Sequence, residues 1–197
     1  ASGDLAPTSH LCLVLIGEGE AFYKGHRMPG ALALEKAGLR PIILEAGEGL
    51  ALVNGTQVMA GLLTLVVHDA HRLAKMADIA CAMSLEVLMG SDAEFDPKIH
   101  LVRPHPGQMD AAHNMRRLTQ NSPIINSHKG CSRVQDAYTL RCSPQVHGAT
   151  RDAIRHVRQV VEIEINSTTT NPLIFTDDND FRLGGNFHGQ PLALTAD

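Results

Sequence analysis

The stretch TQVMAGLLTLVVHDAHRLAKMADIACAMSLEVLM, residues 56–89, decides the fold class of this chain. It contains no proline, and its apolar side chains recur at helical spacing. These positions are Met59, Leu62, Leu63, Val66, Ala70, Leu73, Ala77, Ala80 and Cys81. The spacing predicts one long helix that ends at Gly90. Apolar residues on more than one of its faces indicate burial by partner helices.

Shorter elements are expected on both sides of the long helix. Other helices are predicted at residues 4–16, 31–38, 107–120, about 144–165 and from about 188 onward. Loops, hairpins or irregular stretches are predicted at residues 20–30, 41–53, 91–106, 121–135 and 172–183. Asp4 is a candidate N-cap of the first helix, with Pro7 tolerated in its first turn. The chain therefore reads as all-α, with functional loops at the ends of long helices.

Composition narrows the functional classes. Of the 197 residues, 44% are hydrophobic but only 4% are aromatic, so the core must be aliphatic. A net charge of −4 gives no basic field for nucleic acid. The four irregularly spaced cysteines favour reduced, buried thiols in a cytoplasmic protein. We expect no membrane partner, because no apolar run reaches membrane length and no signal peptide is present.

Several polar motifs are expected to carry no cofactor. Gly17-Glu18-Gly19 reads as a helix terminator rather than a phosphate-binding loop, which leaves no nucleotide site. His68 and His71 lie close together on the long helix, but nothing acidic is spaced to complete a metal site. His100 and His105 lie in a proline-rich loop and are expected to be solvated.

The first three residues, Ala1-Ser2-Gly3, can form an electrophile from the backbone itself. If the Gly3 nitrogen attacks the Ala1 carbonyl carbon and two waters leave, the product is a methylidene-imidazolone ring. Loss of the Ser2 hydroxyl supplies its exocyclic methylene, and Gly3 has no side chain to obstruct the attack. The alternative is an ordinary flexible end in which Ser2 is a plain helix cap.

Longer motifs separate these two interpretations. The tripeptide extends to ASGDLAP at residues 1–7, followed by Ser9-His10. Four further blocks are EGLALVNGT (48–56), QDAYTLRC (135–142), NSTTTNPL (166–173) and GGNFHGQP (184–191). Together and in this order they resemble the aromatic amino-acid ammonia-lyase family. The resemblance implies a bundle of long central helices of the aspartase/fumarase-like type, assembled as a homotetramer whose subunits share active sites. It also implies the imidazolone electrophile without a catalytic metal.

The resemblance also assigns roles to single residues. It implies that Ala1, Ser2, Gly3 and Tyr138 are catalytic, and that Asn54, Gln135, Arg141 and Phe187 bind substrate. Arg141 offers a planar fork for a substrate carboxylate, and Tyr138 lies three positions before it, so the two are neighbours in a helix or turn. Structural alternatives stay open: a turn residue for Asn54, a surface ion pair for Arg141, and core aromatic side chains for Tyr138 and Phe187.

The block RCSPQVHG, residues 141–148, resembles family members that act on L-histidine and release ammonia and urocanate. A tyrosine- or phenylalanine-type lyase or an aminomutase with the same electrophile is the alternative. A catalytically inactive helical homologue is the third possibility, because Gly47 and Thr170 depart from the family pattern, as Gly130 also does. We expect residues 1–197 to be the central part of a single lyase domain, with N- and C-terminal parts missing, and to be inactive in isolation.

Overall fold

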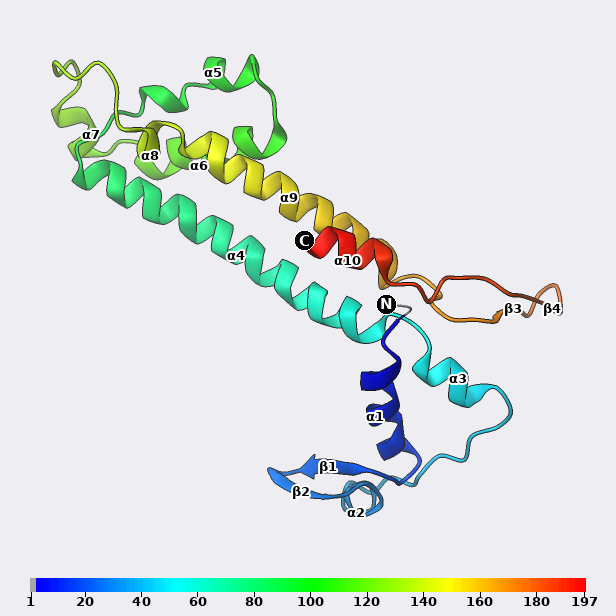
Figure 1. The fold of residues 1–197 in the computed structure, drawn as a ribbon. Coiled ribbons are helices and arrows are strands. Elements are labelled where there is room, and N and C mark those ends of the chain that lie inside the picture. The colour runs from blue at the N-terminus through cyan, green and yellow to red at the C-terminus, as the bar shows by residue number, and fades with distance from the viewer. Residues whose placement is uncertain (1–2) are drawn as a thin grey trace. The chain divides into compact units, whose positions relative to one another are not determined.

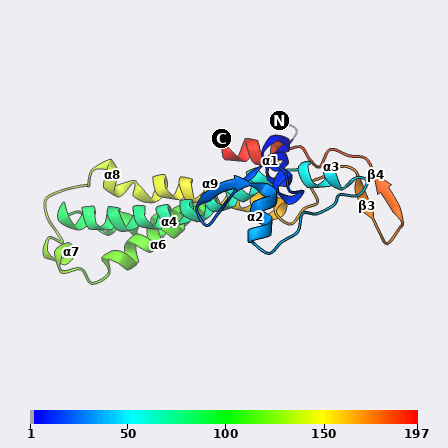
Figure 2. The same ribbon diagram turned by 90° about the horizontal axis from the view of Figure 1, so that it is seen from below.

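The structure is a computed structural model that describes residues 3–197 (Figures 1 and 2). The chain divides into two compact units. The first comprises the described residues up to Thr64 together with Val160–Asp197, and the second comprises Leu65–Gln159. Most of the chain is helical, and the few strands form small hairpins, which confirms the predicted all-α class.

The first unit contains short elements around the ends of two long helices. Its elements are α1 (Leu5–Leu15), β1 (Glu20–Tyr23), β2 (His26–Pro29), α2 (Gly30–Lys36), α3 (Glu48–Val53), β3 (Leu173–Phe175), β4 (Asp180–Arg182) and α10 (Gln190–Ala196). Strands β1 and β2 pair antiparallel, with Glu20 opposite Pro29, and β3 pairs with β4, with Leu173 opposite Arg182. Both hairpins lie within residues 20–30 and 172–183, where hairpins or loops were predicted.

The second unit is a helical bundle (Figure 1). Its elements are most of α4 (Gln57–Val87) and of α9 (Ser143–Glu164), with η1 (Ala93–Phe95), α5 (Pro97–Leu101), α6 (Pro106–Thr119), α7 (Pro123–Ser127) and α8 (Tyr138–Arg141). The long helix predicted from residues 56–89 is confirmed as α4. A buried apolar cluster joins α4, η1, α6, α7 and α8: Ala82, Leu85, Phe95, Met115, Ile125 and Leu140.

Asp78 of α4 links three helices of the second unit. Its side chain is only 1% exposed. Its Oδ1 lies 2.9 Å from Nδ1 of His147 on α9. Its Oδ2 accepts hydrogen bonds from Asn114 of α6, at 2.8 Å, and from Arg151 of α9. A carboxylate buried to this degree is tolerated only when its charge is paired and its lone pairs are used.

Helices α6 and α9 cross at two glycines. A Cβ added to Gly148 would overlap the backbone of Gln108, and one added to Gly107 would overlap the carbonyl oxygen of Gly148. The Gly107 amide also donates to Oδ1 of Asp152 at 2.8 Å, which satisfies a free N–H in the first turn of α6. The close crossing therefore depends on the absence of side chains at both positions.

Three short helices lie in stretches that were predicted to be irregular: α3, α5 and α7. Prolines 97 and 123 stand at the start of α5 and α7, where a missing N–H costs nothing. Asp96 caps α5 by accepting from the Lys98 amide, and Ser122 caps α7 by accepting from the Ile125 amide. Proline thus begins α5 and α7, and the prediction of loops throughout residues 91–106 and 121–135 was wrong for these two segments.

The expectation that His100 is solvated is also wrong. His100 is 2% exposed, and its Nε2 lies 3.1 Å from the carbonyl oxygen of Glu94. Its Nδ1 lies 3.1 Å from Nε2 of Gln108. Because a carbonyl oxygen only accepts, Nε2 carries the proton and Nδ1 accepts from the amide, which describes a neutral ring. His105 is exposed, as predicted.

The cysteines are free thiols, as expected, but they differ in burial. Cys12 is buried, Cys81 and Cys142 are half-buried, and Cys131 is exposed. The prediction of buried thiols therefore holds fully only for Cys12.

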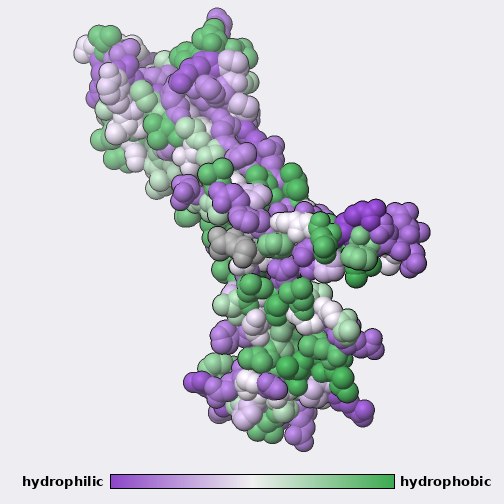
Figure 3. All heavy atoms as spheres, turned by 45° about the vertical axis from the view of Figure 1, so that its right-hand side comes forward, coloured by the Kyte–Doolittle hydropathy of each residue, from purple (hydrophilic) through white to green (hydrophobic). Residues whose placement is uncertain are grey.

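Large apolar side chains remain at the surface, above all on α4. Those more than half exposed on this helix are Leu62, Leu65, Val66, Leu73, Met76, Met83 and Val87. On the face shown in Figure 3, apolar side chains also gather over the part of the first unit that holds α1, α2 and the β1–β2 hairpin. The predicted need for partner helices around α4 agrees with this exposure.

By length and composition alone, the stretch Glu48–Val87 is apolar enough to cross a membrane, which corrects the expectation that no run is long enough. The stretch is not one continuous helix, because α3 ends at Val53 and α4 begins at Gln57. Such a break would leave backbone groups without partners in hydrocarbon. That the protein has no membrane partner stays a prediction.

Candidate active site

The predicted site residues fall into two groups, one in each unit. Gly3, Asn54 and Phe187 belong to the first unit. Gln135, Tyr138 and Arg141 belong to the second. Ala1 and Ser2, which would contribute the rest of the electrophile, lie outside the described residues.

Gly3 brings three of the sequence motifs together. Its φ is +118°, a conformation that side-chain-bearing residues rarely adopt. A Cβ added here would lie 2.7 Å from the carbonyl oxygen of Gly55 and 2.9 Å from that of Phe187. The backbone of Gly3 is thus packed against the Asn54-Gly55 turn and against the motif at residues 184–191. Only glycine fits this position without displacing the backbone.

Asp4, directly after Gly3, also holds the chain against Gly55 and the start of α4. Its amide donates to the carbonyl oxygen of Gly55 at 2.7 Å. Its carboxylate Oδ2 accepts from the Met59 amide at 2.8 Å, in the first turn of α4. Asp4 occupies the N-cap position of α1, as predicted, but its side chain makes no cap bond to that helix. The carboxylate instead occupies the positive end of α4, where a negative charge is stabilised.

Asn54 is buried at the junction of α3 and α4. Gly55 follows with a φ of +151°, and a Cβ there would lie 2.5 Å from the carbonyl oxygen of Thr169. The next residue, Thr56, is buried and donates from Oγ1 to Oε1 of Glu164 at 2.5 Å. The interpretation of Asn54-Gly55 as a turn is confirmed, whereas substrate binding by Asn54 stays a prediction.

Each unit contains a cavity near its predicted residues, of about 370 Å³ in the first unit and about 320 Å³ in the second. In the first unit it is lined by Glu164, by residues 167–169 and by most of residues 185–191. Phe187, at the centre of that last motif, is half-buried. Gly189 is buried there, and a Cβ on it would lie 2.5 Å from Sδ of Met59, so the motif packs directly on α4.

Tyr138 and Arg141 are neighbours on α8, as their spacing predicted. The guanidinium of Arg141 lies 4.5 Å from the centre of the Tyr138 ring. Tyr138 is 72% exposed, so its interpretation as a core aromatic is wrong. Nε of Arg141 is buried without a hydrogen-bond partner among residues 3–197. A buried, unpaired guanidinium N–H is costly, and an incoming carboxylate would satisfy it.

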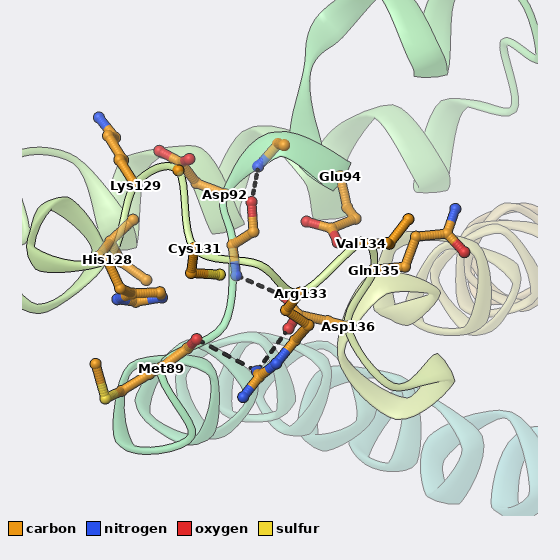
Figure 4. A pocket seen from close by; sticks show the side chains of 14 residues that line it. Met89, Asp92, Glu94, His128, Lys129, Cys131, Arg133, Val134, Gln135 and Asp136 are labelled. Carbon is orange, nitrogen blue, oxygen red and sulfur yellow. Dashed lines mark hydrogen bonds and ion pairs between the residues drawn. The ribbon is translucent and has the colours of Figure 1, made fainter.

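Gln135 lines the cavity of the second unit (Figure 4). The lining combines carboxylates, cations and one thiol, among them Asp92, Glu94, His128, Lys129, Cys131 and Arg133. Glu94 has a buried Oε2 with no hydrogen-bond partner in the described part of the chain. Gln135 itself is exposed and therefore free to hydrogen-bond a ligand.

Sequence reasoning missed the residues that support this second group. Asp136 and Leu140 are buried on either side of the exposed Tyr138. The four-residue spacing of Asp136 and Leu140 was visible in the sequence, but a buried aspartate is not a pattern that spacing alone reveals. Within residues 3–197, no group of three or more metal-ligating side chains is placed to hold a metal ion.

Gly47, one of the departures from the family pattern, has a local structural reason. It precedes α3 with a φ of +89°. Glycine adopts this left-handed conformation without strain, whereas a residue with a side chain, such as the lysine of the family pattern, would be strained there. Gly130 also has a positive φ, +84°. Nothing in the structure explains Thr170.

Solved structures of known proteins share this fold. The chain superimposes with a TM-score of 0.90 on a tyrosine aminomutase from Streptomyces globisporus, with 40% identity over 99% of this chain and 40% of that one. A histidine ammonia-lyase from Trypanosoma cruzi gives a TM-score of 0.87 and 39% identity, over 98% of this chain and 36% of that one. The fold is therefore that of the helical ammonia-lyases and aminomutases.

Residues 1–197 match the aromatic amino acid lyase family throughout, and the chain belongs to that family. Among curated relatives, histidine ammonia-lyases from Gloeobacter violaceus and Myxococcus xanthus are 60% and 58% identical to it over its full length. The chain spans 38% and 39% of the length of these relatives.

Proposed function

We propose that this chain is the central segment of an enzyme that eliminates ammonia from L-histidine to give urocanate. The observation that carries the proposal is the packing of Gly3, whose backbone leaves no room for a side chain beside Gly55 and Phe187. This packing fits a backbone that closes into a ring. The identity of 60% to a histidine ammonia-lyase and the block at residues 141–148 support histidine as the substrate.

The residues around Gly3 fit a methylidene-imidazolone formed from Ala1, Ser2 and Gly3. When present, that group supplies an electrophile that accepts an electron pair from the substrate. Gly3 meets the need for an unobstructed backbone nitrogen, and Asp4 fixes the chain that leaves it. The start of α4 lies directly beside this point, so its positive end stabilises negative charge that develops there. No metal or nucleotide is required by this arrangement.

The remaining side chains have separate tasks in this proposal. Arg141 binds the substrate carboxylate through its planar guanidinium. Tyr138 exchanges the proton that elimination removes from the β-carbon. Asn54 and Gln135 hydrogen-bond the substrate, and Phe187 packs against it, as the family resemblance implies. Elimination needs both a departing amine and a positioned base. In this proposal Tyr138 supplies the base, and the other residues hold the substrate in place beside it.

An aminomutase is the second candidate. The Streptomyces globisporus structure, at 40% identity, favours it. An aminomutase would return ammonia to the β-carbon, so the two candidates differ in product. A catalytically inactive homologue is the third candidate, and Thr170 is the departure that keeps it open.

We also propose that the enzyme works in the cytoplasm as a homotetramer with active sites shared between subunits. The exposed apolar side chains of α4 support burial of that helix by further chain. For the same reason we expect residues 1–197 expressed alone to self-associate and to make no urocanate.

The test compares wild-type full-length protein carrying this segment with Ser2→Ala and with Ser84→Ala, an exposed serine on α4. Absorbance of the imidazolone and product formation from histidine, tyrosine and phenylalanine are measured. We expect urocanate from the wild type and from Ser84→Ala. Ser2→Ala should lose both absorbance and turnover, because alanine has no hydroxyl to eliminate. A β-amino acid product would favour the aminomutase, and wild-type activity in Ser2→Ala would overturn the electrophile.

A further inference from the structure

Asp136 is a buried carboxylate inside the segment that carries Gln135, Tyr138 and Arg141. Its side chain is 2% exposed. Its Oδ2 accepts a hydrogen bond from the Ser91 amide at 2.5 Å, and its Oδ1 accepts from Nη1 of Arg133 at 3.0 Å (Figure 4). Both bonds are charge-assisted, the stronger class of hydrogen bond in proteins.

The partners of Asp136 lie at the C-terminal end of α4. The Gly90 amide closes this end by donating to the carbonyl oxygen of Leu85 at 2.8 Å. Nη1 of Arg133 also lies 3.4 Å from the carbonyl oxygens of both Leu88 and Met89. A cation beside free carbonyls at a helix C-terminus is favourable. Arg133 and Asp136 therefore tie residues 133–136 to a rigid helix end.

Gly90 provides the space for this contact. A Cβ on Gly90 would lie 2.5 Å from Cδ1 of Leu85 and 3.2 Å from Oδ2 of Asp136. A side chain at residue 90 would therefore press on both Leu85 and the carboxylate of Asp136.

A second anchor follows four residues after Asp136. Leu140 is buried in the apolar cluster with Leu85 and Phe95. Tyr138 lies between the two anchors and is exposed. Asp136 and Leu140 therefore fix the backbone on both sides of Tyr138, while the Tyr138 side chain and the side-chain amide of Gln135 remain exposed to a ligand.

We propose that Asp136 is a positioning residue for the reaction: its carboxylate fixes the backbone that aims Gln135, Tyr138 and Arg141 at the substrate. The inference rests on the proposed function for the identity of the substrate. Asp136 acts through its neighbours and does not itself touch the reacting atoms.

The test uses the full-length protein with Asp136→Asn, Asp136→Ala and Arg133→Gln, alone and combined. Asp69→Asn is the matched control, because Asp69 is an exposed carboxylate of α4 that lies 3.5 Å from Nη1 of the also exposed Arg72. Measured quantities are kcat and KM for L-histidine well below the unfolding temperature, imidazolone absorbance, and hydrogen exchange of residues 131–141.

We expect Asp136→Ala to keep the imidazolone absorbance while kcat/KM falls on the order of 10- to 100-fold, the scale of small misplacements of reacting groups. Asp136→Asn should lose less, because its amide oxygen can still accept from Ser91. Exchange of residues 131–141 should become faster. Combining Arg133→Gln with Asp136→Ala should cost less than the product of the two single effects.

Unchanged kcat/KM in Asp136→Ala would overturn the positioning role. The positioning role would also be overturned if the loss of activity in Asp136→Ala equalled the loss of folded protein that carries the imidazolone. If the wild type itself makes no urocanate, the proposed function fails. The exchange measurement then still decides the inference, and unaltered exchange of residues 131–141 in Asp136→Ala overturns it.

Discussion

The amide of Asp4 donates a hydrogen bond to the carbonyl oxygen of Gly55 over 2.7 Å, which joins the chain directly after Gly3 to the turn directly after Asn54. The two residues lie far apart in sequence but share the entry to α4. The carboxylate of Asp4 reinforces the link by capping that helix at Met59. The start of α4 is thus a structural junction directly beside the backbone of Gly3 and Asp4.

Gly3→Ala should prevent formation of the electrophile in the full-length protein. The new Cβ would press on the carbonyl oxygens of Gly55 and Phe187, and the φ of +118° would be strained. Imidazolone absorbance and urocanate formation should both be lost. Gly61→Ala is the control, because a Cβ at Gly61 meets nothing within 4 Å. Normal absorbance in Gly3→Ala would show that the packing at Gly3 does not govern ring closure.

Arg141→Lys should raise the KM for L-histidine steeply. Lysine keeps the charge but loses the planar fork, and a hydrogen bond to a charged group contributes about 1.5–3 kcal/mol. This corresponds to a rise of roughly 10- to 100-fold. Steady-state kinetics with Arg72→Lys, an exposed arginine of α4, as control would measure it. An unchanged KM would remove Arg141 from carboxylate binding.

Gly148→Ala should lower the stability of the second unit. The added methyl group would overlap the backbone of Gln108, so α6 and α9 must move apart. Overpacking of this kind costs about 1–3 kcal/mol. Gly61→Ala, in an open helical position, should instead be neutral or stabilising by up to about 1 kcal/mol. The thermal unfolding midpoint of Gly148→Ala should therefore lie below that of the wild type, and that of Gly61→Ala at or above it. Equal midpoints for the two variants would contradict the close crossing of α6 and α9.

His100 should make stability fall as the pH drops below about 6.5, the ordinary pKa of histidine. Burial lowers the pKa of His100 and Arg116 lowers it further, while the Glu94 carbonyl and Asp96 oppose the shift. Above this pH both states hold a neutral ring. Below it the unfolded chain binds a proton that the folded ring resists, so unfolding is favoured.

His100→Gln should flatten that pH dependence, measured as the urea midpoint between pH 5 and 8. The control is His105→Gln, an exposed histidine nearby. His71 has a pKa lowered by its own burial and by surrounding arginines and Lys75, so some dependence should remain. An identical pH profile in wild type and His100→Gln would exclude the proposed contribution.

Much of the fold follows from local sequence signals. Helix α4 lies where apolar spacing predicted it, and both hairpins lie in stretches predicted as hairpins or loops, because these signals act over a few residues. Helices α5 and α7 escaped prediction because Pro97 and Pro123 begin helices as readily as they end them. The burial of His100 depends on packing of η1 and α6 around it, which no local pattern encodes.

The candidate site was only partly predictable. The family resemblance named Gly3, Asn54 and Phe187, and the structure brings the backbones of Gly3, Gly55 and Phe187 together. It did not reveal that Asp4 caps α4, because the partner amide lies far along the chain. Nor did it reveal Asp136, whose two hydrogen-bond partners are the Ser91 amide, just beyond the end of α4, and the Arg133 side chain, three residues earlier in the chain.

The burial of Asp78 has a consequence for the order in which the second unit assembles. Its carboxylate is stabilised only when α6 and α9 are both in place, since Asn114 comes from one and His147 and Arg151 from the other. A partly docked bundle would hold a buried charge with incomplete partners, which is costly. Docking of α4 with α6 and α9 is therefore expected to be cooperative, without a stable half-assembled intermediate.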